Sequence, residues 1–278
     1  MKIIACLKVV ANPDVLELDL ASEKLVNLYP VLDPLGYQVL EEGLRLRERH
    51  GGRLMALGVA PDEGEELLRG TLLYGADAAI RIWDDSLSEG DAYCVAQAMN
   101  KVMQEHGYDL ILCGSASSDT GSEFMVPALA GLLDIPSATR IISLAVEENG
   151  SRIIAHKKLP RGKREEYSIP LPAVIGLESG INQPRYVAPF SRTYLGGREK
   201  KVEVVKAVPD RAPAHRLVSA LRFAQPRPRV KVGIDISSLS MQDRLRMMRG
   251  ELGGTKEIFE GAPEKGAEKI MARLEKLL

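Results

Sequence analysis

The sequence contains no apolar run that approaches the ~20 residues a membrane-spanning helix requires. Its first residues, Met1-Lys2, lead directly into a short strand-like run, so no signal peptide is indicated and we expect a cytoplasmic protein. An excess of either charge is also missing, because 37 Lys and Arg residues face 38 Asp and Glu residues, a formal net charge of −1. Without a basic surplus, nucleic acid and anionic membranes are disfavoured as partners.

Catalytic and metal-binding patterns are scarce as well. The three cysteines, Cys6, Cys94 and Cys113, lie far apart in apolar contexts and show no metal-ligand spacing. None of the four histidines sits at the end of an expected sheet strand beside a matching carboxylate, so no catalytic triad emerges. A P-loop and a strand followed by G-x-G-x-x-G are both absent. We expect neither a catalytic residue nor a metal ligand, and any redox chemistry would require a cofactor.

At 278 residues with 45% hydrophobic content, the chain can bury a substantial core. Its first half alternates short apolar runs, the first of them expected to be central, with segments of helical spacing. Such alternation predicts an α/β fold, a Rossmann-like parallel sheet with helices on both faces. The expected strands cover 3–10, 53–59, 78–83 and 110–113, and the expected helices cover 34–50, 62–74, 91–106 and 122–133.

After residue 135 the pattern changes to closely spaced strands, expected at 137–146, 151–159, 165–169 and 173–177. The turns between them have hairpin composition, which predicts an antiparallel extension of the sheet. One turn is basic, because six of the nine residues from His156 to Arg164 are His, Lys or Arg. Such a turn is either solvated surface or a contact for a partner.

The C-terminal part has many Pro, Arg and Gly residues and little core periodicity beyond Pro184. Two amphipathic segments, 241–248 and 263–278, interrupt it. A segment of this kind is rarely stable alone, so we expect a long C-terminal arm that contacts another chain. The predicted division is an α/β domain over 1–185 and a docking loop with the arm over 186–278.

The most informative segment is 108–136, YDLILCGSASSDTGSEFMVPALAGLLDIP. A buried strand ends in Gly114, small hydroxyl residues and Asp119 follow, and helical apolar spacing resumes at Phe124. A strand that delivers such a loop to a helix start gathers backbone N–H groups near the positive end of the helix dipole, which suits phosphate or another anion. The segment indicates a nucleotide site, or else an ordinary strand-to-helix turn whose Ser and Asp side chains only cap the helix.

Several segments follow one another in a characteristic order: the opening IIACLKVV, DPLGYQVLEEGLRLRERHGG, LLRGTLLYGADAAIRI, LILCG, LPAVIGLESGINQPRY and GTKEIFEGAPEKGAEKIMARL. In this order the chain resembles the beta (small) subunit of electron transfer flavoproteins, the family that includes the FixA-like proteins. The second segment is similar to the family's Asn-Pro-Phe-x-x-x-Ala-x-Glu-Glu-Ala helix, and the fifth to its Leu-Pro-Ala-Val and Asn-Glu-Pro-Arg-Tyr elements. The resemblance covers Met1 to about Val205 and, more weakly, the C-terminus.

The resemblance implies an electron carrier subunit that forms a heterodimer with an alpha subunit and passes electrons between a dehydrogenase or other oxidoreductase and an acceptor. The alpha subunit would hold most of the redox-active FAD, while this chain would bind its own adenine nucleotide, AMP or a second FAD, in residues 1–185. The implied nucleotide contacts, many of them backbone groups, are Cys6, Leu7, Lys8, Gly58, Val59, Cys113, Gly114, Ser117, Ser118, Asp119, Thr120, Gly121, Ser122, Glu123, Phe124 and Met125.

Departures from the family pattern indicate a divergent member with unusual partners. The loop keeps only the first aspartate of the family's Gly-Lys-Gln-Ala-Ile-Asp-x-Asp, and the family's acidic Gly-Gly hairpin is here Leu159-Pro160-Arg161-Gly162. In place of Leu-Pro-x-Ile-Met, the dehydrogenase-recognition loop is expected to present Pro189, Phe190, Arg192, Tyr194 and Leu195. An alternative that stays open is a stand-alone protein that binds or hydrolyses an adenine nucleotide on the same fold.

Overall fold

The computed structural model describes most of the chain up to residue 208 and a short helix beyond it. The described residues are 1–19, 21–22, 24–87, 91–147, 150–187, 202–208, 240–248, 267 and 271. The chain divides into two compact units, Met1–Gln225 and Pro226–Leu278. The predicted boundary after residue 185 stays a prediction.

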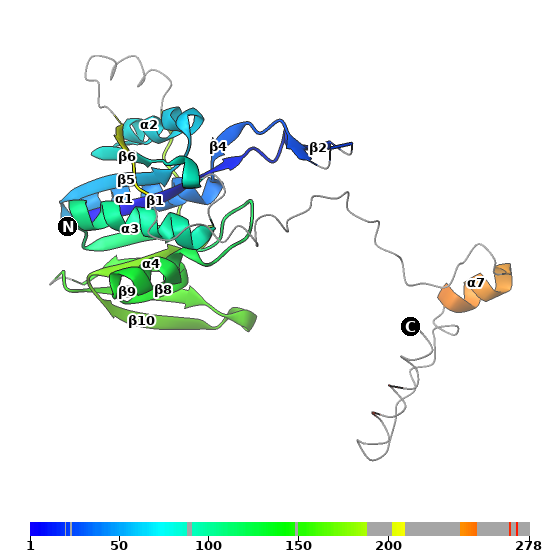
Figure 1. Ribbon diagram of the computed structural model, residues 1–278. Coiled ribbons are helices and arrows are strands. Elements are labelled where there is room, and N and C mark those ends of the chain that lie inside the picture. Colours follow the sequence, from blue (N-terminus) through cyan, green and yellow to red (C-terminus); the bar gives the residue numbers. More distant parts are fainter. Residues whose placement is uncertain are drawn as a thin grey trace. The chain divides into compact units, whose positions relative to one another are not determined.

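One large, mostly parallel sheet forms the first unit (Figure 1). β1 (Lys2–Ala11) is an inner strand of this sheet, and it pairs in parallel with β5 (Arg53–Val59) on one side and with β7 (Leu110–Gly114) on the other. β1 is central because five consecutive side chains, Ile3 to Leu7, are buried, a pattern typical of a strand covered on both faces.

Two further strands continue the parallel sheet beyond β5. β6 (Ala78–Ile82) pairs with β5, as the apolar run predicted, and β12 (Glu203–Val205) pairs with β6. β12 was not predicted, since three residues in a Pro-, Arg- and Gly-rich segment give no strand periodicity.

The antiparallel extension is confirmed on the other side of the sheet. β8 (Ser137–Val146), β9 (Arg152–Lys158) and β10 (Arg164–Pro170) form consecutive antiparallel pairs. The last predicted strand of this series, β11 (Ala173–Leu177), is not antiparallel: it inserts between β7 and β8 and runs parallel to both. All its side chains are buried, which fits a central strand and explains why it does not extend the edge.

Three short strands near the N-terminus were also not predicted. β2 (Glu17–Asp19) and β3 (Lys24–Val26) form a separate antiparallel hairpin, and β4 (Pro30–Leu32) lies antiparallel to the end of β1. Each has only three residues, too few for a period of two to be recognised.

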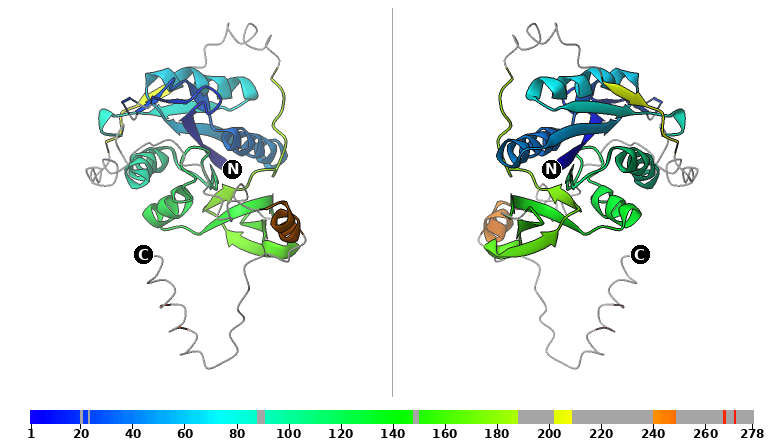
Figure 2. Two further views of the ribbon diagram at one scale, coloured as in Figure 1. Left: turned by 90° about the vertical axis from the view of Figure 1, so that its right-hand side faces the viewer. Right: turned by 90° about the vertical axis from the view of Figure 1, so that its left-hand side faces the viewer.

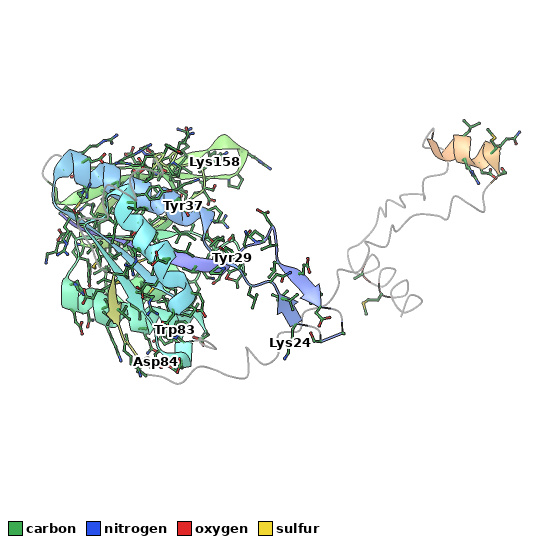
Figure 3. The ribbon with its side chains drawn as sticks, turned by 90° about the horizontal axis from the view of Figure 1, so that it is seen from above. Lys24, Tyr29, Tyr37, Trp83, Asp84 and Lys158 are labelled. Carbon is green, nitrogen blue, oxygen red and sulfur yellow. The ribbon has the colours of Figure 1, made fainter. Side chains whose placement is uncertain are left out.

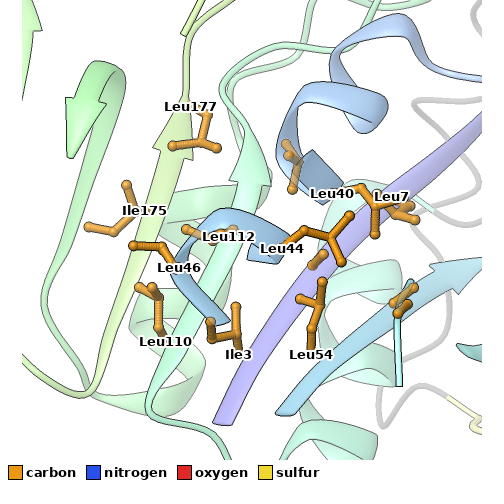
Figure 4. Packing of buried hydrophobic residues seen from close by; sticks show 14 of the residues in the cluster. Ile3, Leu7, Leu40, Leu44, Leu46, Leu54, Leu110, Leu112, Ile175 and Leu177 are labelled. Carbon is orange, nitrogen blue, oxygen red and sulfur yellow. The ribbon is translucent and has the colours of Figure 1, made fainter. Parts of the chain in front are cut away.

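Helices cover both faces of the sheet, as predicted (Figure 2). α1 (Pro34–His50) and α2 (Glu65–Tyr74) pack on one face, and α3 (Ala92–His106) and α4 (Met125–Leu133) on the other. Short helical turns lie at Asp62–Gly64, Asp85–Leu87 and Pro160–Gly162. Figure 4 shows the core beneath α1. Leu40, Leu44 and Leu46 of the helix meet strand residues such as Ile3, Leu110 and Ile175 there.

The bounds of α1 follow from its end residues. Asp33 precedes the helix and its side chain accepts a hydrogen bond from the N–H of Leu35, while Pro34 occupies the first helical position. Gly51 ends the helix with a φ of 71°, a conformation in the region that favours glycine. The helix predicted over 34–50 is therefore confirmed, and it holds Asp33 in a fixed place beside the sheet.

The second unit is described at α7 (Met241–Met248) and at residues 267 and 271. The start of α7 is capped reciprocally: the N–H of Asp243 donates to Oγ of Ser240 at 3.2 Å, and that hydroxyl donates to the Asp243 carboxylate at 2.7 Å. The amphipathic segment 241–248 is thus a helix, whereas most of the second amphipathic segment lies outside the described residues.

Candidate functional site

The sheet topology reverses between β1 and β7. After β1 the chain continues to β5 and β6 on one side of the sheet, and it then returns to add β7 on the other side. In open α/β sheets, ligands bind outside the carboxyl ends of the strands at such a reversal. Lys8 near the end of β1 and the loop 115–124 after β7 both lie at this place. The segment that indicated a nucleotide site from sequence is thus at the position where this topology offers one.

A side-chain network joins Lys8 to the loop. Nζ of Lys8 lies 2.7 Å from Oδ1 of Asp119 and 3.3 Å from Oγ of Ser117, and that hydroxyl lies 3.0 Å from Oγ1 of Thr120. The Lys8 side chain is 45% exposed and that of Asp119 is 35% exposed, so solvent reaches both charges. The network gathers a cation, a carboxylate and two hydroxyls on an accessible surface.

The charge state of Asp119 is fixed by this network. Burial alone would raise the pKa of Asp119, but hydrogen bonds from Lys8 and Ser117, together with the charge of Lys8, outweigh burial and lower it. The carboxylate is therefore ionised at neutral pH. Because it would repel a phosphate, it suits a ribose hydroxyl or the bracing of the loop, whereas Lys8 suits an anion.

Asp33 is a site residue that the sequence reasoning missed. Its side chain is buried, and Oδ2 accepts hydrogen bonds from the N–H and the hydroxyl of Ser118, each at 2.8 Å. Oδ1 caps α1 through the N–H of Leu35 at 2.9 Å, and the backbone N–H of Asp33 donates to the carbonyl of Lys8 at 2.9 Å. One residue thus connects β1, α1 and the loop. An Asp before a helical Pro signals a cap in sequence, but it does not reveal the second contact.

Two glycines that were predicted as nucleotide contacts have a packing reason to be glycine. A Cβ atom on Gly114 would lie 2.9 Å from Cδ2 of Leu35, and one on Gly58 would lie 2.6 Å from Cδ2 of Leu68. Both positions therefore let a helical side chain reach the sheet closely.

The remaining predicted contacts on strands are Cys6, Leu7, Cys113 and Val59. The first three side chains are buried in the core, and that of Val59 is partly buried. A hydrogen bond with Cys113 and burial raise the pKa of the Cys6 thiol well above its ordinary value. The side chains of Cys6, Leu7 and Cys113 are committed to packing, so any ligand contact at these residues would involve backbone groups.

The start of the following helix was predicted wrongly. The expected helix began at Ser122, but α4 begins at Met125. Gly121 has a φ of 63°, and Oγ of Ser122 accepts a hydrogen bond from the N–H of Phe124 at 3.3 Å. The segment 121–124 before α4 is therefore irregular. No side chain caps α4, which leaves its first N–H groups without an intrahelical partner at the end of the loop.

Glu123 is placed beside the antiparallel extension. Its carboxylate forms an ion pair with Arg140 of β8, whose backbone N–H donates to Oγ of the buried Ser115 at 2.7 Å. The hydrogen bond from Arg140 lowers the pKa of Glu123, against a smaller effect of desolvation, and the positive charges of Arg140 and Lys157 lower it further. The loop is thereby linked to β8 and lies within the field of the basic β9–β10 turn.

A second cluster missed from sequence ties the segment after β11 to α1. The Glu41 side chain, which is 5% exposed, accepts a hydrogen bond from Nε of Arg185 at 2.8 Å, and Glu48 accepts one from Nη1 of the same arginine at 2.7 Å. Nδ2 of Asn182 donates to Glu42 at 2.9 Å. Residues 182–185 therefore attach the segment that follows β11 to α1.

Comparisons with known proteins agree with this architecture. A family model described as the electron transfer flavoprotein domain matches residues 30–210. The chain belongs to the electron transfer flavoprotein beta-subunit family. It is similar to the electron transfer flavoprotein subunit beta of Bacillus subtilis (strain 168), with 36% identity over 157 residues, 56% of this chain and 60% of the relative.

Other relatives match at lower identity. The beta subunit of Thermoanaerobacterium thermosaccharolyticum is 28% identical over 209 residues, 74% of this chain and 79% of the relative. Protein FixA of Azotobacter vinelandii is 26% identical over 160 residues, 56% of this chain and 57% of the relative. The resemblance inferred from the order of the sequence segments is confirmed at the level of the family.

Some predictions for this family member lie beyond what the structure describes. The expected docking residues Pro189, Phe190, Arg192, Tyr194 and Leu195 are outside the described residues.

Within the described part of the chain, no helix has the length and hydropathy needed to cross a membrane. In the same part, no three His, Cys, Asp or Glu side chains gather in a way that could hold a metal ion.

Proposed function

We propose that this chain is the beta subunit of an electron transfer flavoprotein. It binds an adenine nucleotide, AMP or a second FAD, and with an alpha subunit it passes electrons between a dehydrogenase or other oxidoreductase and an acceptor. The FAD shared with the alpha subunit supplies the redox chemistry when bound. The observation that carries the proposal is that a member of this family has an accessible cation and hydroxyl cluster where its sheet topology reverses.

The residues present fit the nucleotide. Lys8 and the first N–H groups of α4 would hold a phosphate, and Asp119 would accept a hydrogen bond from a ribose hydroxyl. The hydroxyls of Ser117 and Thr120 supply further donors beside Lys8. Hydrogen bonds to charged groups contribute about 1.5–3 kcal/mol each, so each of these contacts would add to the affinity for the nucleotide.

Introducing a carboxylate into the loop is expected to remove the nucleotide. Ser122→Glu and Gly121→Glu each place a negative charge beside the proposed phosphate, and at about 4 Å such a repulsion reaches roughly 4 kcal/mol near a protein surface. Nucleotide content per heterodimer, measured by denaturing extraction and chromatography, should fall at least about tenfold. Ser122→Glu is the cleaner variant, because Gly121 has a positive φ that a side chain strains.

The matched control is Gly131→Glu in α4. Gly131 is exposed, a Cβ atom there meets nothing within 4 Å, and it lies beyond the loop. This variant should retain the nucleotide. Unchanged content in Ser122→Glu would refute the loop as the binding site, and the same extraction of the wild type, by counting AMP and flavin, decides between AMP and a second FAD.

The remaining parts of the chain complete the proposal. Residues 186–278 would serve as the docking loop and as an arm that contacts the alpha subunit, with Phe190 and Arg192 facing an oxidoreductase. An apolar anchor such as Phe190 would carry much of the energy of such an interface, so a changed anchor implies a changed partner. A partner other than the usual acyl-CoA dehydrogenases is therefore proposed.

A further inference from the structure

The turn between β9 and β10 carries a positive charge that the described residues leave unbalanced. Five Lys or Arg side chains and two Glu side chains lie between 157 and 166, a net charge of +3, in a chain whose net charge is −1. Four of the basic residues are exposed and form no ion pair or side-chain hydrogen bond within the described part of the chain. These four, which we name the basic tip, are Lys158, Arg161, Lys163 and Arg164.

The strand register makes this arrangement unfavourable for the chain alone. Lys158 of β9 lies directly opposite Arg164 of β10, and like charges at directly opposed positions destabilise an antiparallel pair. The next pair in the same hairpin, Lys157 with Glu165, has opposite charges. The β2–β3 hairpin also places opposite charges across from each other, in Asp19 and Lys24. The like-charged pair is therefore a local exception.

Nearby carboxylates do not neutralise the basic tip. Oε2 of Glu166 lies 3.1 Å from Nε2 of His156, and Glu165 accepts a hydrogen bond from the hydroxyl of Tyr167. Since side chains alternate along a strand, Lys158 lies on the opposite side of β9 from the buried Ile153. The charges of the tip face away from the core and stay open to a partner.

The backbone of the turn adds a second unfavourable feature at the same place. Arg161 has φ 62° and ψ 28°, a left-handed conformation that is uncommon for residues with a Cβ atom. Pro160 before it and Gly162 after it hold the turn, so the guanidinium stands at the end of the hairpin. Strained residues that the surrounding structure maintains are often functional.

We propose that the basic tip docks against an acidic surface of the alpha subunit, an inference that rests on the proposed function. A permanent subunit offsets the like-charged pair for as long as the complex exists, whereas a transient electron donor would leave the pair unbalanced for most of the time. Four clustered cations on a chain of net charge −1 give a small patch, which matches a local cluster of carboxylates better than an extended polyanion.

The test uses the full chain, the alpha subunit and two matched charge reversals. Lys158→Glu converts the like-charged pair into an opposite-charged one, so the thermal midpoint of the full chain should rise while its affinity for the alpha subunit falls about tenfold at low ionic strength. The difference in affinity should vanish at about 1 M salt, where the screening length is about 3 Å. A merely structural role would not move stability and affinity in opposite directions.

Lys24→Glu is the control, because Lys24 is an exposed lysine on the other hairpin, well separated from Lys158 (Figure 3). It creates a like-charged pair with Asp19, so it should lower the thermal midpoint and leave affinity for the alpha subunit unchanged. In the wild-type complex, a carbodiimide, which joins a lysine amine to a contacting carboxylate, should link Lys158 or Lys163 to the alpha subunit.

Three outcomes would overturn the inference: equal affinity of wild type and Lys158→Glu at low salt, equal weakening by Lys24→Glu, or cross-links of the tip confined to this chain. They leave the proposed function intact as long as the wild-type chain binds the alpha subunit and retains its nucleotide. A wild-type chain that binds no alpha subunit would instead refute the proposed function.

Discussion

Replacing Glu41 by alanine is expected to lower the free energy of unfolding by about 3 kcal/mol. The Glu41 side chain is 5% exposed and accepts hydrogen bonds from Nε of Arg185 at 2.8 Å, from the backbone N–H of Arg185 at 3.2 Å and from Nε of Arg45 at 2.9 Å. Its removal leaves partly buried cationic donors without an acceptor and releases the segment after β11 from α1. Denaturant unfolding measures the loss, which is a large part of the ~5–15 kcal/mol of an ordinary domain.

Glu48→Ala is the matched control because Glu48 binds the same Arg185 but is 47% exposed. Exposed ion pairs contribute about 0–1 kcal/mol, so this variant should lose less than about 1 kcal/mol. Glu41→Gln keeps the volume and an acceptor oxygen but removes the charge, and it should fall between the two. Equal losses for Glu41→Ala and Glu48→Ala would contradict the importance of burial at Glu41.

The same contacts predict that the protein loses stability in acid. Burial alone would raise the pKa of Glu41, but hydrogen bonds from Arg185 and Arg45 outweigh it and lower the pKa; a hydrogen bond from Arg185 also lowers the pKa of Glu48. A carboxyl whose pKa is lower in the folded state stabilises that state above its unfolded pKa, about 4.3 for Glu. This contribution is lost as the pH falls through the folded pKa.

Unfolding measured as a function of pH should therefore show stability falling below about pH 4.3, and Glu41→Gln should reduce the fall. The fall should be complete once the pH is below the lowered pKa of both carboxyls. A pH profile of Glu41→Gln parallel to that of the wild type over this range would show that Glu41 does not contribute to acid sensitivity.

The sequence predicted elements whose signal is local. The bounds of α1, β5 and β11 were predicted to the residue, because Pro34, Gly51 and buried apolar runs mark them within a few positions. The position of β11 between β7 and β8 was not predictable in this way. A parallel strand is placed by contacts with residues far along the chain, and hairpin-like turns before it favoured a simpler order.

The candidate site shows the same division. The hydroxyl loop was predicted from sequence because a strand end followed by small polar residues is a local pattern, whereas Lys8 was predicted only through the resemblance to the family. Asp33 and Glu41 were missed because their partners, Ser118 and Arg185, are 85 and 144 positions away. In the sequence, Asp33 is already explained as a helix cap and Glu41 as one of the charged residues of α1. The local pattern therefore gives no sign that either carboxylate makes a distant contact. Only the folded chain shows that the Asp33 carboxylate both caps α1 and accepts hydrogen bonds from Ser118.

Asp33→Ala is expected to have the second large effect, about 2–4 kcal/mol of the free energy of unfolding. The change removes the cap of α1 and leaves the N–H and hydroxyl of Ser118 without the buried carboxylate oxygen that both contact at 2.8 Å. Because the loop then loses its fixed attachment to α1, the proposed nucleotide should also dissociate at least about tenfold faster. Denaturant unfolding and nucleotide retention during dialysis measure the two effects on one sample.

Two further variants separate the helix cap from the loop. Ser118→Ala removes the hydroxyl contact and keeps the backbone N–H contact, so it should cost about 1 kcal/mol and leave α1 capped. Asp33→Asn supplies a single carbonyl oxygen in place of two carboxylate oxygens, so it can serve Leu35 or Ser118 but not both in the observed geometry. If Asp33→Ala lost stability yet held its nucleotide as long as the wild type, Asp33 would act as a helix cap alone. Faster loss of the nucleotide from Asp33→Asn, at nearly normal stability, would establish that Asp33 positions the loop.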